Sequence, residues 1–301
     1  MAPQPTRPPS PLFEENTERS IGEIPINAGP HSNLFYYDPV PGDMTAVYAA
    51  GPDIENPSFF DQFHRIMFDQ EGKIYAWDLG LAAKEAPEAV NEIADVADPM
   101  WDASESVMLF HNPDSAYLFV RFDQPAPPPD ARSGVWLQGQ VLGFPKIAAV
   151  GSRHGGIVDA NLDDAATEVA FITGDGGLYI YGIRAGTLYQ ATAVNQVGDG
   201  RVEEMALCPA GSQVAFRSGS HLFLYFLQSN VIDPLPFANA ADDAIYAHAP
   251  HWITNQEFWV LLDLPDGRTL FARYNWLTET VRAAFFFNTA LGAGFQTTTS
   301  R

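Results

Sequence analysis

A short unit recurs along this 301-residue chain: an apolar pair, a polar turn and then an apolar triplet. The pairs end at residues 68, 110, 171, 216 and 262. The turns that follow them read "DQEG", "HNPDS", "TGDGG", "RSGSH" and "DLPDG", at 69–72, 111–115, 173–177, 217–221 and 263–267. Gly, Asp, Asn and Pro supply the backbone angles that short hairpins need. Each unit is therefore predicted to contain a β-hairpin.

Two further apolar segments flank each hairpin. The preceding ones are "PSFF" 57–60, "PMW" 99–101, "IVDANL" 157–162, "EMALC" 204–208 and "PHWI" 250–253. Looser ones follow, such as "TLYQATAV" 187–194 and "TVRAAFFF" 280–287. Four strands repeating about every 45 residues are typical of a β-propeller blade. Helical periodicity is confined to 80–95, where Pro87 interrupts it, so at most a short helix is expected there.

The fold class is predicted to be all-β, a β-propeller of six four-stranded blades, with five or seven blades as the alternatives. Five blades are complete in the sequence. The sixth would combine strands from 33–50 with a C-terminal strand from 288–295, which would close the ring and remove exposed sheet edges. The longest interval between units, which separates residues 110 and 171, contains a predicted insertion at about 123–151 that carries one strand and a loop.

The first 30 residues are expected to form an extended arm rather than part of the domain at 31–301. Prolines at positions 3, 5, 8, 9 and 11 exclude a helix or sheet interior there. The arm would be a tether or a frayed terminus. No apolar run is long enough for a membrane helix, and no signal peptide is visible. An extracytoplasmic location, with its signal removed, is favoured over a cytoplasmic one.

The charge balance restricts the class of partner. With 16 Lys and Arg against 37 Asp and Glu, the net charge is −21. Nucleic acids and anionic membranes are bound through Lys and Arg, so both are excluded as expected partners. Other proteins are the favoured partners, and a glycan or a small molecule is the alternative. The charge also has a simpler explanation, since it keeps a protein soluble.

The sequence "ALCPAGSQVAFRSGSHLFLY" at 206–225 resembles the repeat of TolB-type propellers, in which Ser-Pro-Asp-Gly precedes an apolar strand. Residues 99–120 and 250–272 carry weaker copies, and "AWD" at 76–78 resembles the end of a WD repeat. "CPAG", "DDAA" and "DASE" stand where the TolB motif has Ser-Pro-Asp-Gly. The resemblance covers roughly residues 33–290. It implies a propeller that serves as a binding platform.

The candidate ligand-binding residues follow from the propeller prediction. The first strand of a blade lines the central channel, and Asp102, Asp159 and Glu204 lie in or beside such strands. His251 stands at the start of another first strand. The aromatic residues Trp136 and Phe144 lie in the predicted insertion, where they would form a contact surface or seal the gap between blades.

A metal site is considered at Asp159, Asn161 and Asp163. Their alternate spacing matches the first half of a calcium loop, although Asp164 and Ala170 stand where Gly and Glu are required. Calcium is the only cofactor that the sequence suggests. The competing interpretation is an Asp-rich turn that caps itself through side-chain hydrogen bonds.

These features favour a non-enzymatic protein-binding or scaffold propeller, with an accessory subunit of a larger assembly as one form of it. The alternative is an extracytoplasmic hydrolase or lyase that uses channel carboxylates or a calcium ion. An enzyme would need polar groups from several blades to converge on one point.

Overall fold

The computed structural model describes residues 34–38, 43–47, 55–60, 65–78, 83–122, 138–237, 246–264 and 268–287. The predicted arm at 1–30 and the C-terminal segment 288–295 lie outside these residues. Within them no helix has the length and apolar character needed to span a bilayer.

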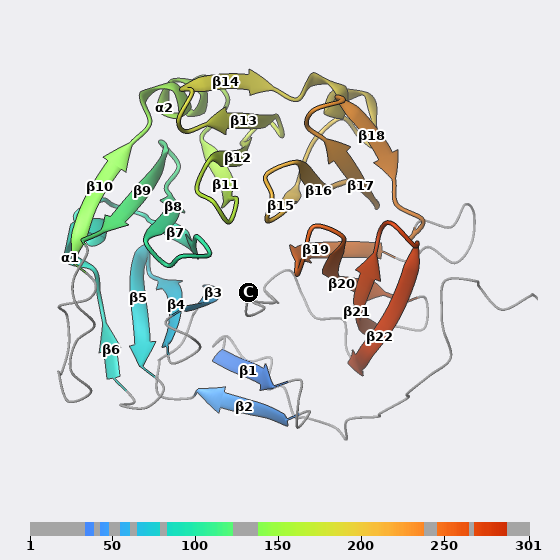
Figure 1. Cartoon of the computed structure of the whole chain (residues 1–301), viewed down its shortest axis with the longest axis horizontal. Coiled ribbons are helices and arrows are strands. Elements are labelled where there is room, and N and C mark those ends of the chain that lie inside the picture. Colours follow the sequence, from blue (N-terminus) through green and yellow to red (C-terminus); the bar gives the residue numbers. More distant parts are fainter. Residues whose placement is uncertain are drawn as a thin grey trace, which may run out of the picture.

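The described strands form five antiparallel four-stranded sheets arranged around a common axis (Figure 1). Blade 1 contains β3 (Glu55–Phe60), β4 (Arg65–Gln70), β5 (Lys73–Asp78) and β6 (Ala83–Glu85). Blade 2 contains β7 (Ala97–Trp101), β8 (Val107–His111), β9 (Ala116–Arg121) and β10 (Gly139–Gly143). Blade 3 contains β11 (Ile157–Leu162), β12 (Glu168–Thr173), β13 (Leu178–Gly182) and β14 (Thr187–Gln190). Blade 4 contains β15 (Glu204–Leu207), β16 (Gln213–Ser218), β17 (His221–Phe226) and β18 (Val231–Pro234). Blade 5 contains β19 (Tyr246–Trp252), β20 (Glu257–Asp263), β21 (Thr269–Asn275) and β22 (Thr280–Phe287).

The prediction of an all-β propeller is confirmed, but the prediction of six four-stranded blades is not. The described residues give five such blades and one two-stranded sheet, formed by β1 (Leu34–Asp38) and β2 (Asp43–Val47). This small sheet lies between blades 1 and 5 in Figure 1. Of the N-terminal segment, the described residues form β1 and β2, and the C-terminal strand that was expected to extend them falls outside the described residues.

The recurring apolar pair has a common structural role. In four blades the second residue of the pair is a Phe, and it stands opposite an aromatic residue on the other strand of the hairpin. The ring centroids of these pairs are 5.3 to 6.1 Å apart, and the pairs are Phe68–Tyr75, Phe110–Tyr117, Phe171–Tyr179 and Phe216–Phe223. Such cross-strand aromatic pairs stabilise sheets. The pattern that identified the hairpins in the sequence is therefore a packing pattern between their two strands.

Most of the core lies between neighbouring blades. One cluster of buried side chains includes residues from blades 2, 3 and 4, a second joins blades 4 and 5, and a third joins blades 1 and 2. Trp252, fully buried on β19, donates its indole N–H to the carbonyl oxygen of Ala206 on β15 at 2.8 Å. Blade-to-blade packing is thus both apolar and directional.

Two short helices interrupt the β structure. Helix α1 (Glu88–Asn91) follows Pro87, as the interrupted periodicity predicted. Helix α2 (Pro145–Gly151) lies in the segment predicted as an insertion and was not predicted. The same segment supplies β10, the outer strand of blade 2, so the blade is completed from within the predicted insertion. A 3-10 helix at Thr192–Gln196 follows β14, where the sequence suggested a longer strand.

A charged rim around one end of the channel

The innermost strands carry a repeated bulge near their first residues. The pairing register shifts between Glu55 and Ser58 on β3, between Ala97 and Met100 on β7, and between His248 and His251 on β19. Each shift contains an X-Pro pair, and proline cannot donate a ladder hydrogen bond. Asp98 and Ala249, which precede prolines, have φ values of 53° and 49°. The bulge therefore turns an N–H group toward the preceding blade.

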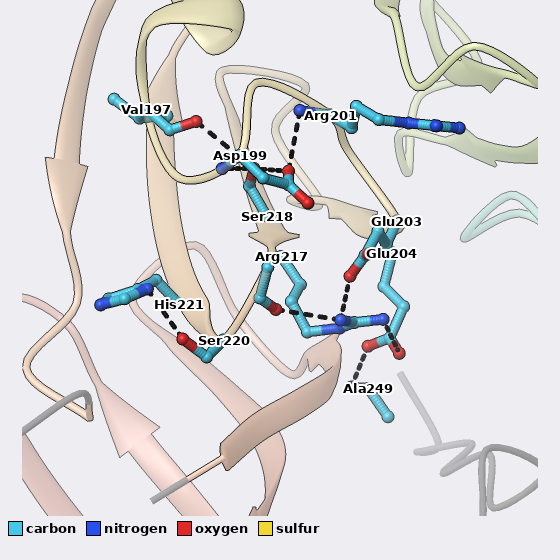
Figure 2. Close-up of polar contacts among 11 residues, drawn as sticks. Val197, Asp199, Arg201, Glu203, Glu204, Arg217, Ser218, Ser220, His221 and Ala249 are labelled. Carbon is cyan, nitrogen blue, oxygen red and sulfur yellow. Dashed lines mark hydrogen bonds and ion pairs between the residues drawn. The ribbon is translucent and has the colours of Figure 1, made fainter. Parts of the chain in front are cut away.

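Glu204 receives one of these N–H groups. Its Oε2 accepts a 2.6 Å hydrogen bond from the backbone N–H of Ala249, and its Oε1 accepts a 3.0 Å bond from Arg217 Nη2 (Figure 2). Arg217 also forms an ion pair with Glu203 and donates to the carbonyl oxygen of Gly219. The Glu204 carboxylate, predicted to bind a ligand, thus connects blade 4 to blade 5 through Oε2 and bonds to Arg217 of its own blade through Oε1.

Asp98 makes the equivalent connection between blades 1 and 2. Its backbone N–H donates to Asp69 Oδ2 on β4 at 2.9 Å, and its carboxylate pairs with Nε2 of the buried His111. Burial alone would lower the pKa of His111, but the hydrogen bond that its ring donates to Asp98 and the charges of Asp98 and Asp159 raise that pKa above its ordinary value. The imidazole therefore keeps its proton to a higher pH than an ordinary histidine does.

Asp159 lies on β11 of blade 3, beside this pair. Its Oδ1 accepts a 3.1 Å hydrogen bond from the side chain of Asn161. Burial, followed by the charge of Asp98, raises the pKa of Asp159 to about 7, and His111 opposes that rise. We refer to Asp98, His111, Asp159, Glu204 and Arg217 as the charged rim.

Asp102 and Asp163 lie at the opposite end of the inner strands, in the turns that follow β7 and β11. Asp102 Oδ1 accepts two backbone hydrogen bonds, from Ser106 and Val107, at 2.8 Å. Asp163 accepts from Thr167 N, Thr167 Oγ1 and Glu168 N. Both carboxylates cap their own turns. Asp102 thus lies at the other end of β7 from Asp98 and the charged rim, and its role as a ligand-binding residue stays a prediction.

The predicted calcium arrangement at Asp159, Asn161 and Asp163 is not formed. Asn161 donates to Asp159, whereas Asp163 is occupied by its turn, as the self-capping alternative predicted. Among the described residues, no group of three or more His, Cys, Asp or Glu side chains could hold a metal ion. Cys208, buried on blade 4, takes the position that Asp102 and Asp163 have in their blades, since its Sγ accepts from Ser212 N at 3.3 Å.

Two other predicted residues, Phe144 and His251, lie apart from the charged rim. Phe144 packs its ring against Tyr181, with centroids 5.0 Å apart, and so seals blade 2 against blade 3. His251 stands in register with Trp259 on the far side of the β19 bulge. Trp136 lies outside the described residues. Sequence reasoning missed Asp98, His111 and Arg217, although the X-Pro pairs at 56–57, 98–99 and 249–250 were a signal for the bulges that create the rim.

No family model matches the chain, and no curated protein matches it. Several solved structures are similar to the chain in fold. A TolB chain of Agrobacterium tumefaciens is 13% identical with a TM-score of 0.60, covering 85% of this chain and 89% of that one. TolB from Acinetobacter baumannii is 14% identical with a TM-score of 0.55, covering 87% and 63%.

Two other propellers are similar at the same level. The β-propeller domain of Cps50 (Swd1) from Myceliophteria thermophila is 11% identical with a TM-score of 0.54, covering 87% of this chain and 81% of that domain. A chain of the mitotic checkpoint complex is 11% identical with a TM-score of 0.51, covering 86% and 74%. The resemblance to TolB-type and WD-repeat-like propellers that the repeats suggested is thereby confirmed as a likeness of fold, and the chain has the architecture of a β-propeller.

Proposed function

We propose that this chain is a non-enzymatic binding platform that presents the loops of one propeller face to a protein partner. The observation that supports it best is the use of the carboxylates. Glu204 bridges blades 4 and 5, Asp69 bridges blades 1 and 2, and Asp102 and Asp163 cap turns. Groups committed in this way hold the ring rigid, and a rigid ring loses little conformational entropy when a partner docks on it.

The comparisons support the same proposal. One structurally similar chain comes from the mitotic checkpoint complex, a multi-protein assembly. An accessory subunit of an assembly needs a stable frame and exposed loops, and the charge of −21 favours a partner with basic groups at its contact surface. The partner class is therefore a protein rather than a nucleic acid.

Two serines of blade 4, one at each face of the propeller, allow a test of which face binds the partner. Ser220 precedes β17 at the end of the blade that carries Glu204, and Ser229 follows β17 at the opposite end. Both residues are exposed. A photo-crosslinking amino acid would be placed at each position in turn, and each variant would be irradiated in lysate of the source cells. We expect one defined adduct from one of the two positions. Similar mixtures of many crosslinked products from both positions, or no adduct from either position, would contradict a platform that binds through one face.

One observation favours the alternative of a propeller hydrolase or lyase. Asp159 has a pKa of about 7, which suits a group that exchanges protons near neutral pH, and it lies beside a second acid, Asp98. The test is a turnover screen with glycoside, ester and phosphoester substrates, comparing the wild-type chain with Asp159→Asn. Turnover that the substitution abolishes would establish the enzyme and displace the platform.

A further inference from the structure

The two ends of the inner strands are held together by different kinds of contact. At the carboxyl-terminal end of the inner strands, hydrogen bonds connect the turns of blades 2, 3, 4 and 5 one to the next. Ala103 N–H donates to the carbonyl oxygen of Asp164 at 3.1 Å, Asp164 N–H to that of Pro209 at 2.9 Å, and Ala210 N–H to Asn255 Oδ1 at 2.8 Å. We refer to this series as the backbone belt. None of its donors or acceptors titrates between pH 4 and 9.

The charged rim at the other end contains groups that do titrate. Blades 1 and 2 are joined there through the carboxylate of Asp69, and blades 4 and 5 through that of Glu204. Arg217 gives the Glu204 contact a permanent positive charge. Between blades 2 and 3 the only cation of the rim is the imidazole of His111, which is charged only when it is protonated.

His111 is enclosed by acids from several elements. From β7 it faces Asp98 and from β11 it faces Asp159, while the residue opposite it on β9 is the uncharged Ala116. Asp69 of β4 accepts a hydrogen bond from the backbone N–H of Asp98. The negative charge of Glu204 on β15 acts on Asp159. His111 is only 5% exposed. Loss of its proton would leave two neighbouring carboxylates from adjacent blades without a positive charge between them.

We propose that His111, Asp98 and Asp159 form a proton-controlled fastening between blades 2 and 3, so that the charged rim loosens as the proton is lost while the backbone belt stays closed. This device would make the packing of blade 2 against blade 3 at one end of the inner strands depend on pH. It goes beyond the binding function proposed above and does not depend on it.

The direction of the effect follows from linkage. The pKa of Asp159 rises from 3.8 to about 7 on folding, and that of His111 rises above 6.5. Between the unfolded and folded pKa values of each group, the folded chain holds more protons than the unfolded chain. The two groups therefore contribute most stability at low pH, and this contribution is lost as the pH rises. For each extra proton held, the unfolding equilibrium constant increases by about tenfold per pH unit.

Two backbone amides report on the two ends of the same interface. Ile157 N–H donates to the carbonyl oxygen of Pro113 at 2.9 Å near the charged rim, and Ala103 N–H donates to Asp164 within the backbone belt. Both bonds join blades 2 and 3. Hydrogen exchange of the wild-type chain would be measured by NMR at pH 6 and pH 8, and corrected for the intrinsic pH dependence of exchange. We expect the protection of Ile157 to fall by about tenfold at pH 8 and that of Ala103 to change by less than about twofold.

Asp159→Asn tests the assignment, because it removes one of the two repelling charges and keeps the shape of the side chain. It should retain the protection of Ile157 at pH 8. His111→Gln should show at pH 8 the low protection of the wild type, and His221→Gln, which changes an exposed histidine on β17, should behave as the wild type at both pH values. Should His111→Gln not fold, the wild-type and Asp159→Asn measurements still decide. Equal changes at Ile157 and Ala103 in the wild type, or an unaltered pH response in Asp159→Asn, would overturn the proposal.

Discussion

The carboxylate of Glu204 on β15 accepts a 2.6 Å hydrogen bond from the backbone N–H of Ala249 on β19, a residue whose φ of 49° directs that N–H toward the neighbouring blade. A side chain from one repeat is thus paired with a backbone irregularity in the next. Asp69 and Asp98 repeat the relationship between blades 1 and 2. Two of the blade junctions at this end therefore depend on acids that stand opposite bulges.

Removal of the Glu204 carboxylate should weaken the junction of blades 4 and 5. Glu204→Ala leaves the Ala249 N–H and one side of Arg217 without an acceptor, which should cost about 2–3 kcal/mol of unfolding free energy. Glu203→Ala is the matched control, because Glu203 pairs with the same arginine but is 38% exposed, and it should cost less than about 1 kcal/mol. Urea denaturation followed by circular dichroism compares the two, and equal losses would refute the asymmetry.

The strain at Ala249 predicts a stabilising substitution. A non-glycine residue in the left-handed region is disfavoured by roughly 1 kcal/mol, so Ala249→Gly should raise the unfolding free energy by about 0.5–1 kcal/mol. Ala247, two residues earlier on β19, is buried in the strand. There the same substitution should lower stability by about 1 kcal/mol. Thermal melting of the two variants should give shifts of opposite sign.

The capping role of Asp163 can be separated from its charge. Asp163→Ala removes the acceptor for Thr167 and Glu168 and should cost about 2 kcal/mol. Asp163→Asn keeps the Oδ1 acceptor and should cost roughly half as much. The two variants would be compared by urea unfolding in the presence and absence of calcium. A calcium-dependent gain in the wild-type chain that both variants lose would restore the metal site that the geometry argues against.

Glu257 predicts a loss of stability in acid. Its partial burial would raise its pKa, but hydrogen bonds from Arg273 and Asn275 and the charge of Arg273 hold that pKa below 4.5. A carboxyl with a lowered pKa stabilises the fold above its unfolded value, and the contribution disappears as the pH falls. The Glu257→Gln variant should therefore be less stable than the wild type at pH 7, and the difference should shrink as the pH falls below 4.5. Glu92→Gln is the control, because it removes an exposed carboxyl that lies away from Arg273.

The repeat could be found in the sequence because it records contacts between residues that are close along the chain. Phe171 and Tyr179 face each other across one hairpin, so their spacing recurs wherever that hairpin recurs. Strands β11 and β22 were predicted with the bounds that the structure gives them, at 157–162 and 280–287. The helix α2 was missed, since Pro145 and Gly151 bound a segment too short to show periodicity.

The candidate site was less predictable, because it depends on which residues meet across blades. Asp102 and Asp159 seemed equivalent in the sequence, since both lie in or beside a first strand. The structure places them at opposite ends of the inner strands, where the charges of Asp98 and His111 act on Asp159. Single-sequence patterns give the position of a residue within its own repeat, whereas its neighbours in the next repeat also depend on the bulges.

The backbone belt has a consequence for how freely these repeats can vary. Its turns read "DASE", "DDAA", "CPAG" and "TNQE", yet three of the four turns join the series through main-chain N–H and C=O groups, and only proline lacks the N–H. Most side chains at these three turns can therefore be exchanged without breaking the series, provided that the local cap is kept. That freedom is a physical reason why a chain can share an architecture with TolB while sharing only 13% of its residues with one such protein.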